Sequence, residues 1–262
     1  PLRRVGIVST RISGTDGVSL EIAKWTEILK RLGCECFFVC GRCDRPPEQT
    51  YLIELADFAH PEIRAVTREA FGRQTRTREL SERIRRLATN IKDEVYAALE
   101  QFQLDMLVVE NALTIPINVP LGAALVEVLL ETGLPCVAHH HDFFWERDRY
   151  VVSAVDDYLL AVFPPPMSEI DHVVISTLAG KEFSRRTGLS YHLIPNVMDF
   201  SQPPPPPDDY GADFREAVGL SPDDLLIMQP TRVVERKGIE HTIELVRRLD
   251  DPRCKIVVTH DG

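Results

Sequence analysis

Short apolar runs alternate with stretches of helical periodicity along most of this chain. The apolar runs predict strands at 4–9, 36–40, 51–55, 105–109, 136–139, 172–175 and 191–194. Apolar residues spaced by three and four predict helices at 19–32, within 68–102, and at 122–132 and 178–187. Because strands that alternate with helices are typical of βαβ units, we expect an α/β fold with a Rossmann-like, doubly wound parallel sheet.

One stretch of prolines interrupts this alternation. Pro203 to Pro207 are consecutive, and proline neither continues a helix nor fits a central strand. After them the pattern predicts helices at 213–218 and 239–249 and strands at 225–228 and 255–259. We therefore expect a first domain over 1–200, a linker over 201–211 and the beginning of a second Rossmann-like domain over 212–262. Two strands are too few to bury both faces of a parallel sheet, so this second domain is expected to be incomplete.

The composition narrows the function classes. Hydrophobic residues make up 44% and charged residues 27%, as in ordinary globular proteins. We find no apolar run of membrane-spanning length and no signal peptide. The net charge of −10 argues against a nucleic-acid-binding protein, which normally presents a basic face. The arginines between 73 and 86 are interpreted as a solvated face balanced by Glu69, Glu79 and Glu82.

Cysteines cluster at 34, 36, 40 and 43. A zinc ribbon would need two close pairs far apart in the sequence, and that spacing is missing. Strand alternation places Cys34, Cys36 and Cys40 on one face, so we interpret them as buried apolar residues and expect no metal. Free thiols in a chain without an export signal favour a cytoplasmic location.

Candidate ligand-binding residues follow the predicted strands, where open parallel sheets bind ligands. The first such loop carries Asp16, Gly17 and Val18 before a helix. Glycine lets the backbone approach a phosphate, and a helix start offers unpaired N–H groups. A simple tight turn explains the loop equally well, and the glycine spacing of a dinucleotide site is missing.

Three further loops carry polar residues. Glu110 and Asn111 follow a predicted strand. Either side chain is expected to contact a polar ligand or to cap a helix. Because neighbouring side chains alternate faces, one or two of the histidines at 139–141 are expected to face a ligand. The alternative is a loop whose histidines satisfy backbone groups. Asn196 follows the last strand of the first domain, at a turn or at the mouth of an interdomain cleft.

The loop from 229 to 238 joins a predicted strand to a predicted helix. It contains Arg232 and Lys237 and ends at Gly238. Two cations beside a helix N-terminus are a suitable receptor for a diphosphate.

Together these motifs resemble retaining glycosyltransferases of the GT-B fold, in the large group 1 class known as family 4. The segment 16–18 resembles the Gly-Gly-Val loop of that family, with Asp16 at the first glycine. His141 and Asp142 resemble the strand end that bears the active-site histidine, and Ser176 resembles the serine of a later strand end. The segment 194–199 resembles Ile-Pro-Asn-Gly-Val-Asp, and 231–238 resembles the Gly-Arg…Lys-Gly signature, with Thr231 at the glycine.

The resemblance implies a role for each matched residue. Arg232 and Lys237 would hold the donor diphosphate and stabilise the leaving nucleotide without a metal or other cofactor. Gly17 and its neighbours, with Asn111 and Asn196, would line the donor or acceptor site, and His141 would contact the transferred sugar. The donor would be a nucleotide sugar of the GDP-mannose or UDP-glucose type, transferred with retention. The acceptor would be a small soluble sugar, sugar phosphate or polyol acid.

The family's later glutamates have no counterpart before residue 262, and 259–262 resembles the strand just before them. We therefore expect this chain alone to transfer no sugar. The alternative is a non-catalytic module that binds a sugar or a phosphorylated metabolite. No nucleic-acid partner or transmembrane segment is expected, and a homodimer is left open.

Overall fold

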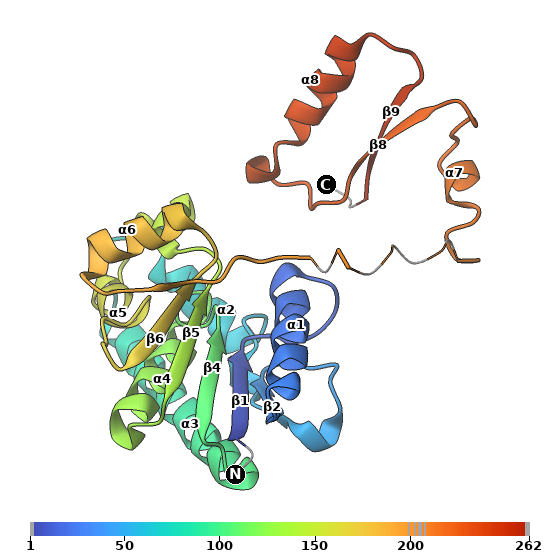
Figure 1. Cartoon of the computed structure of the whole chain (residues 1–262). Coiled ribbons are helices and arrows are strands. Elements are labelled where there is room, and N and C mark those ends of the chain that lie inside the picture. The colour runs from blue at the N-terminus through green and yellow to red at the C-terminus, as the bar shows by residue number, and fades with distance from the viewer. Residues whose placement is uncertain (1–2, 199, 202, 204–205, 207, 260–262) are drawn as a thin grey trace. The chain divides into compact units, whose positions relative to one another are not determined.

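The computed structural model describes residues 3–198, 200–201, 203, 206 and 208–259 (Figure 1). Asp199, part of the proline run and the segment 260–262 lie outside the described residues. The chain divides into two compact units, 1–197 and 198–262, each described by itself. The predicted domain limits at 200 and 211 remain predictions.

Unit 1 is built on a seven-stranded parallel sheet in the order β3-β2-β1-β4-β5-β6-β7. This confirms the expected α/β fold. The strands are β1 (Arg3–Ser9), β2 (Cys34–Cys40), β3 (Thr50–Leu52), β4 (Met106–Glu110), β5 (Cys136–His140), β6 (Ile170–Val174) and β7 (His192–Leu193). The order turns back at β1 and β4, so the loops after these two strands diverge and leave room for a ligand.

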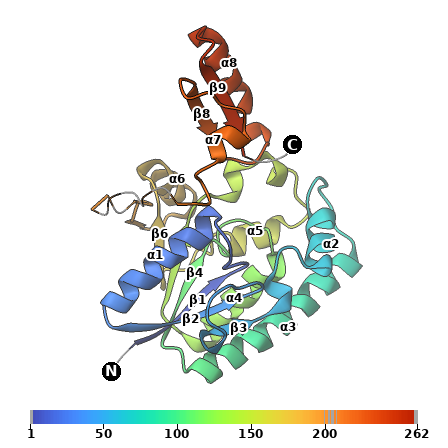
Figure 2. The ribbon, with the colours of Figure 1, turned by 90° about the vertical axis from the view of Figure 1, so that its right-hand side faces the viewer.

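Helices cover both faces of this sheet (Figure 2). The helix α1 (Gly17–Arg31) packs on one face, where Ile22 joins Val5, Ile7 and Cys36 in one apolar cluster. The opposite face carries α2 (Pro61–Ala70), α3 (Arg78–Phe102), α4 (Val119–Thr132) and α5 (Asp156–Val162) around the largest cluster. The helix α6 (Thr177–Thr187) buries Phe183 on the same side as His140. Short 3-10 turns occupy Pro47–Gln49, Glu54–Ala56, Phe144–Glu146 and Asp148–Tyr150.

The helical region predicted over 68–102 proves to be two helices. The first, α2, begins at Pro61 and ends at Ala70, because Phe71 leaves the helix to bridge Ser153 and Gly72 takes a φ of 78°. The helix α5 was not predicted, because its seven residues are too few for a clear helical period.

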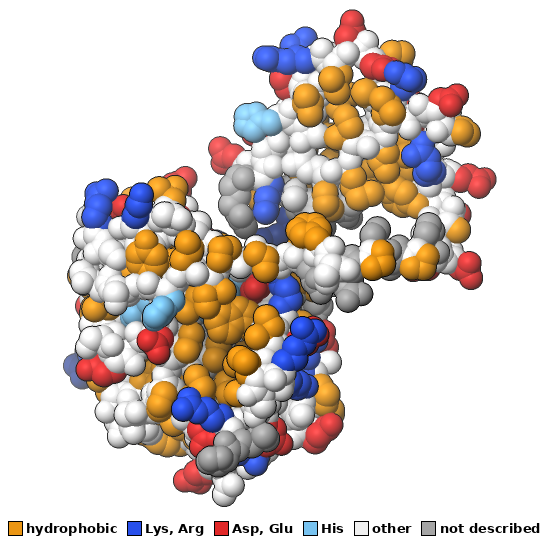
Figure 3. Space-filling view, in the orientation of Figure 1, with side chains coloured by type: hydrophobic (Ala, Val, Ile, Leu, Met, Phe, Trp, Pro, Cys, Tyr) orange, Lys and Arg blue, Asp and Glu red, His pale blue; other side chains and the backbone are white. Residues whose placement is uncertain are grey.

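Of the three cysteines interpreted as buried, Cys36 and Cys40 are buried and Cys34 is half-buried. Cys34, Cys36 and Cys40 all contact the apolar cluster under α1. Four of the arginines between 73 and 86 pair with carboxylates, including Arg83 with Glu69 at 2.7 Å and Arg78 with Glu82 at 2.7 Å. Side chains of both charges appear on the visible face of unit 1 (Figure 3).

Unit 2 contains α7 (Phe214–Ala217), β8 (Leu225–Gln229), a 3-10 turn (Glu235–Lys237), α8 (Ile239–Leu249) and β9 (Cys254–Val258). Its two strands pair in parallel. No described residue of this unit is buried, and apolar side chains gather on its visible face (Figure 3). Among the described residues of the whole chain, no helix is long and apolar enough to cross a bilayer.

The apolar stripe of α3 carries much of the core of unit 1, so its truncation is expected to be costly. Leu87 is 1% exposed, whereas Leu178 on α6 is 79% exposed. We expect Leu87→Ala to lower the free energy of unfolding by about 3 kcal/mol, because it leaves a cavity. We expect Leu178→Ala to change it by less than about 0.5 kcal/mol. Urea unfolding followed by tryptophan fluorescence measures both, and equal effects of the two variants would contradict the assignment of the core.

Candidate functional site

Polar side chains meet at the carboxyl ends of β1, β4 and β5 in unit 1. They surround a cavity of about 160 Å³. Its lining combines two arginines, two carboxylates, an asparagine and several apolar groups: Ser9, Thr10, Arg11, Asp16, Val18, Phe58, Glu110, Asn111, Ile115, Ile117 and Arg147. Typical pockets for drug-sized ligands span about 300–1,000 Å³, so this cavity suits a small group.

Asp16 closes the N-terminus of α1 at one side of the cavity. Its Oδ1 accepts hydrogen bonds from the backbone N–H groups of Val18 at 3.2 Å and Ser19 at 3.3 Å. Its Oδ2 accepts from the Ser19 hydroxyl at 2.8 Å and from Arg11 at 2.9 Å. Burial raises the pKa of Asp16, but the bonds from Ser19 and Arg11 outweigh it and lower the pKa below its usual value. A carboxylate therefore occupies the helix end that a phosphate would otherwise use.

Arg147 reaches the cavity from the segment that follows β5. Its guanidinium forms an ion pair with Asp142, and Asp142 is thereby tied to the cavity wall. The turn between them is fixed because the Phe143 backbone N–H donates to the Glu146 carboxylate at 2.6 Å. Asp142 thus acts on the cavity through Arg147.

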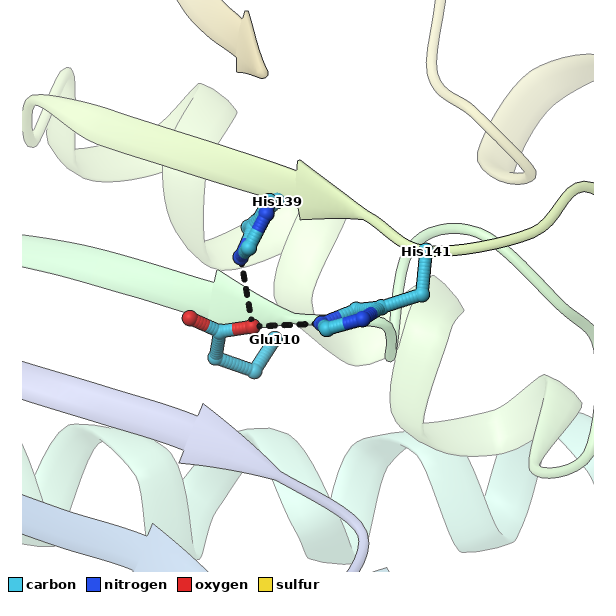
Figure 4. Close-up of side chains that lie close together, drawn as sticks. All are labelled: Glu110, His139 and His141. Atoms are coloured by element: carbon cyan, nitrogen blue, oxygen red, sulfur yellow. Dashed lines mark hydrogen bonds and ion pairs between the residues drawn. The ribbon is translucent and has the colours of Figure 1, made fainter. Parts of the chain in front are cut away.

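A buried carboxylate, that of Glu110, is hydrogen-bonded to two of the consecutive histidines at the carboxyl ends of β4 and β5 (Figure 4). Glu110 ends β4 and is fully buried. Its Oε2 lies 2.9 Å from Nδ1 of His139 and 3.1 Å from Nε2 of His141. Because a carboxylate oxygen only accepts, both imidazole nitrogens donate to it. Each ring therefore carries a hydrogen on the nitrogen that faces Glu110.

The charge of Glu110 depends on these two hydrogen bonds. Burial raises the pKa of the carboxyl, but the bonds from His139 and His141 and their favourable electrostatics lower it overall. Oε1 of Glu110 and Nε2 of His139 are buried without a hydrogen-bond partner among the described residues. One oxygen therefore carries the contacts to both rings.

The same three residues are the group of potential metal ligands within the described part of the chain. Their ligand atoms lie within 4.8 Å of one another. Two imidazoles and a carboxylate suit several divalent metals. In the structure, the atoms that face one another are joined by the two direct hydrogen bonds, whereas Glu110 Oε1 and His139 Nε2 have no partner among the described residues.

His141 connects this group to two other predicted site residues. Its backbone N–H donates to Oδ1 of Asn111 at 3.4 Å, and its Nδ1 lies 3.4 Å from Nδ2 of Asn196. Asn111 has a φ of 61°, a left-handed conformation that asparagine tolerates, and it turns the chain sharply after β4. The structure thus brings His141, Asn111 and Asn196 together with Glu110.

His140 points to the opposite face of the sheet and has a structural role. Its Nδ1 lies 2.7 Å from the Thr114 hydroxyl and its Nε2 lies 2.9 Å from Nδ1 of His172. Burial lowers the pKa of His140 well below its ordinary value and lowers that of His172 to about 4. These rings therefore stay neutral at physiological pH.

The remaining predicted residues do not line this cavity. Ser176 caps α6, where its hydroxyl accepts from the Ala179 N–H at 3.1 Å. Gly17 opens α1, and a side chain at this position would meet nothing within 4 Å. Arg232 and Lys237 are exposed in unit 2. Their roles in ligand binding remain predictions.

Two cavity residues, Arg11 and Arg147, were missed by sequence reasoning. Arg11 lies in the same loop as Asp16, and only the fold shows that the two pair across the cavity. Arg147 follows β5 by several residues in a loop without a recognisable motif. An arginine at that distance from a strand end carries no signal of its own.

Comparison with known proteins finds relatives that match most of this chain. The chain is similar to mannosylglucosylglycerate synthase of Petrotoga mobilis, with 31% identity over 248 residues. It is also similar to the synthase of that name from Thermotoga maritima, with 30% identity over 253 residues. The matches cover 92% and 95% of this chain but 56% and 57% of the relatives, so the chain spans a little over half of their length.

The fold is shared with a solved glycosyltransferase. WaaG, a glycosyltransferase involved in lipopolysaccharide biosynthesis, matches with a TM-score of 0.57 and 12% identity, over 98% of this chain and 64% of WaaG. This likeness confirms the expected fold. No family model matches the sequence.

The buried histidine pair of His140 and His172 should make the protein less stable in weak acid. In the unfolded chain, His172 binds a proton once the pH falls below its ordinary pKa of 6.5. In the folded protein, His172 binds a proton only near pH 4, because its pKa is lowered to about 4. The stabilising contribution is therefore fully present above pH 6.5 and is lost as the pH falls toward 4, by about 3 kcal/mol.

The substitution His172→Gln should flatten this dependence, and His192→Gln at an exposed site should leave it unchanged. Urea unfolding at several pH values, followed by the tryptophan fluorescence of unit 1, measures the difference. A wild-type slope in His172→Gln would show that another group causes the acid sensitivity.

Proposed function

We propose that this chain belongs to the glycosyltransferase group 1 family, and that the complete protein transfers a sugar from a nucleotide diphosphate sugar to a small sugar acid; the similarity to two mannosylglucosylglycerate synthases and the shared fold support this. The transfer proceeds with retention of anomeric configuration, as the resemblance of the motifs at 16–18, 141–142 and 231–238 implies. The observation that carries the proposal is the small cavity lined by Arg11, Arg147 and Asn111, next to His141.

Unit 1 binds the acceptor in this proposal. The relatives are named for a product that contains glycerate, and glycerate carries a carboxylate. A planar guanidinium recognises a carboxylate through two parallel hydrogen bonds, and two guanidiniums line the cavity. Asn111 offers an amide for the acceptor hydroxyls. The cavity volume of about 160 Å³ favours a small acid over a polymer.

Unit 2 binds the donor. Arg232 and Lys237 flank the turn before α8, and both side chains are exposed there. Two cations at this position would bind the diphosphate and neutralise the charge that develops on it as the glycosidic bond breaks. The mannosyl group in the name of the relatives favours GDP-mannose over a donor of the UDP-glucose type.

The hydrogen bonds of His141 suggest how the sugar is held. Its ring is oriented by Glu110 on one side and Asn196 on the other. An oriented imidazole would contact the transferred sugar near its reacting carbon. The acceptor hydroxyl then attacks from the face that the diphosphate leaves, and its proton passes to the departing phosphate oxygen. This route uses no protein nucleophile.

The transfer reaction can be tested directly on the complete protein. We expect it to consume GDP-mannose only when an acceptor such as glucosylglycerate is present, and to release GDP. NMR spectroscopy of the product should show the anomeric configuration of the donor. Failure to consume GDP-mannose or UDP-glucose with any sugar acid would exclude the enzyme and favour a binding module.

Arg147 should determine acceptor affinity. We expect Arg147→Gln to raise KM for an acidic acceptor about 10- to 100-fold, because a charge-assisted hydrogen bond contributes about 1.5–3 kcal/mol. The KM for the donor should stay unchanged. The matched control is Arg149→Gln, since Arg149 lies outside the cavity. An equal effect of Arg147→Gln on the neutral amide of the same acceptor would contradict carboxylate recognition.

A further inference from the structure

Two cysteines at the end of β2 form a pair that the proposed transfer reaction does not use. Cys40 is the last residue of β2, and Cys43 follows after Gly41 and Arg42. This spacing, with two residues between the cysteines, is that of redox-active dithiols. We propose that Cys40 and Cys43 form a reversible disulfide by exchange with a small-molecule disulfide such as oxidised glutathione.

The turn places both sulfurs against the same apolar cluster. Cys40 is part of the cluster under α1, and Cys43 packs on it. The Cys40 thiol also donates to the Arg42 carbonyl at 3.3 Å, and the Thr50 hydroxyl donates to Cys43 Sγ at 3.5 Å. Gly41 packs so tightly on the backbone of Asp57 that a side chain would clash, so the turn is fixed in this shape.

The two thiols differ in accessibility and acidity. Cys40 is fully buried, whereas Cys43 is half-buried. A hydrogen bond from Cys40 to the Cys43 thiolate, together with that from Thr50, lowers the pKa of Cys43 to about 6 although burial opposes it. The same hydrogen bond and burial raise the pKa of Cys40. Cys43 is therefore the attacking thiolate and Cys40 the resolving thiol.

The exchange balances in two steps. The Cys43 thiolate attacks one sulfur of the oxidised glutathione, forms a mixed disulfide and releases one glutathione thiolate. Cys40 then loses its proton and attacks Cys43 Sγ, which releases the second glutathione and closes the protein disulfide. The protein loses two hydrogens, and one small-molecule disulfide is reduced to two thiols.

A metal site is a weaker interpretation of this pair. Within the described part of the chain, the group of three potential ligands is Glu110, His139 and His141, and it includes no cysteine. Two thiolates alone leave a zinc ion short of its usual four ligands.

The turn also contacts the loop that lines the cavity. The Ile12 N–H donates to the Arg42 carbonyl at 2.8 Å, and the Gly41 N–H donates to the Thr10 carbonyl at 3.2 Å. Thr10 and Arg11 belong to the cavity wall. The disulfide would therefore form within the framework that holds Arg11 in place.

Peptide mapping after incubation of the complete protein with oxidised glutathione tests the pair. We expect a peptide that joins Cys40 to Cys43, the loss of both thiols and their full return with dithiothreitol. Cys40→Ser should accumulate a mixed disulfide on Cys43, and Cys43→Ser should form neither product. Cys36→Ser, on the same strand and equally buried, should behave as the wild type.

Two results would overturn the proposal. One is a wild-type protein that keeps both thiols or maps its disulfide to another cysteine. The other is a pH profile of the rate of Cys43 alkylation by iodoacetamide whose midpoint lies at the ordinary thiol pKa of about 8.5 instead of about 6. The alkylation series needs no disulfide to form, so it tests the activated thiol independently.

Discussion

The hydrogen bonds from two imidazoles to one buried carboxylate are the interaction on which the candidate site depends. Glu110 is taken out of water entirely, and a lone carboxylate in that position would become protonated. The bonds from His139 and His141 keep its pKa low instead. Loss of either ring would remove one of the two hydrogen bonds that offset the burial of the Glu110 charge. Loss of the carboxylate would remove the hydrogen bond that orients each ring.

This constraint explains how three consecutive histidines acquire different roles. On a strand, neighbouring side chains alternate faces. His139 and His140 therefore lie on opposite faces, where His139 contacts the ring of Trp25 on α1 and His140 joins His172 and Phe183. His141 comes after the strand ends, and it turns back toward Glu110. One short segment thus supplies core packing on both faces and one side chain at the ligand edge.

The fold was largely predictable from the sequence because its signals are local. Buried strands such as β1 and β4 and the apolar stripe of α3 repeat with clear periods, and the predicted alternation led directly to the parallel sheet. The break at Phe71 was not predictable, because it depends on a bridge to Ser153, far along the chain. The short helix α5 is likewise held by packing of Leu159 and Val162 in the core.

The candidate site was predictable only in part. Motif positions pointed to His141, Asn111 and Asn196, which the fold brings together. The pairing of Glu110 with two histidines depends on the register of β4 and β5, in which Glu110 faces His139. Arg11 and Arg147 enter the cavity through loop geometry, which no sequence period encodes. Long-range register and loop conformation thus account for what the sequence did not reveal.

Nitrogen-15 NMR spectroscopy of the histidine rings tests the central claim most directly, because it locates the ring protons. We expect a proton on Nδ1 of His139 and on Nε2 of His141, each slowed in exchange by its bond to Glu110. In Glu110→Gln both protons should exchange faster, while the ring of His140 keeps its signals. A wild-type spectrum without protons at those two nitrogens would contradict the claim that Glu110 organises the site.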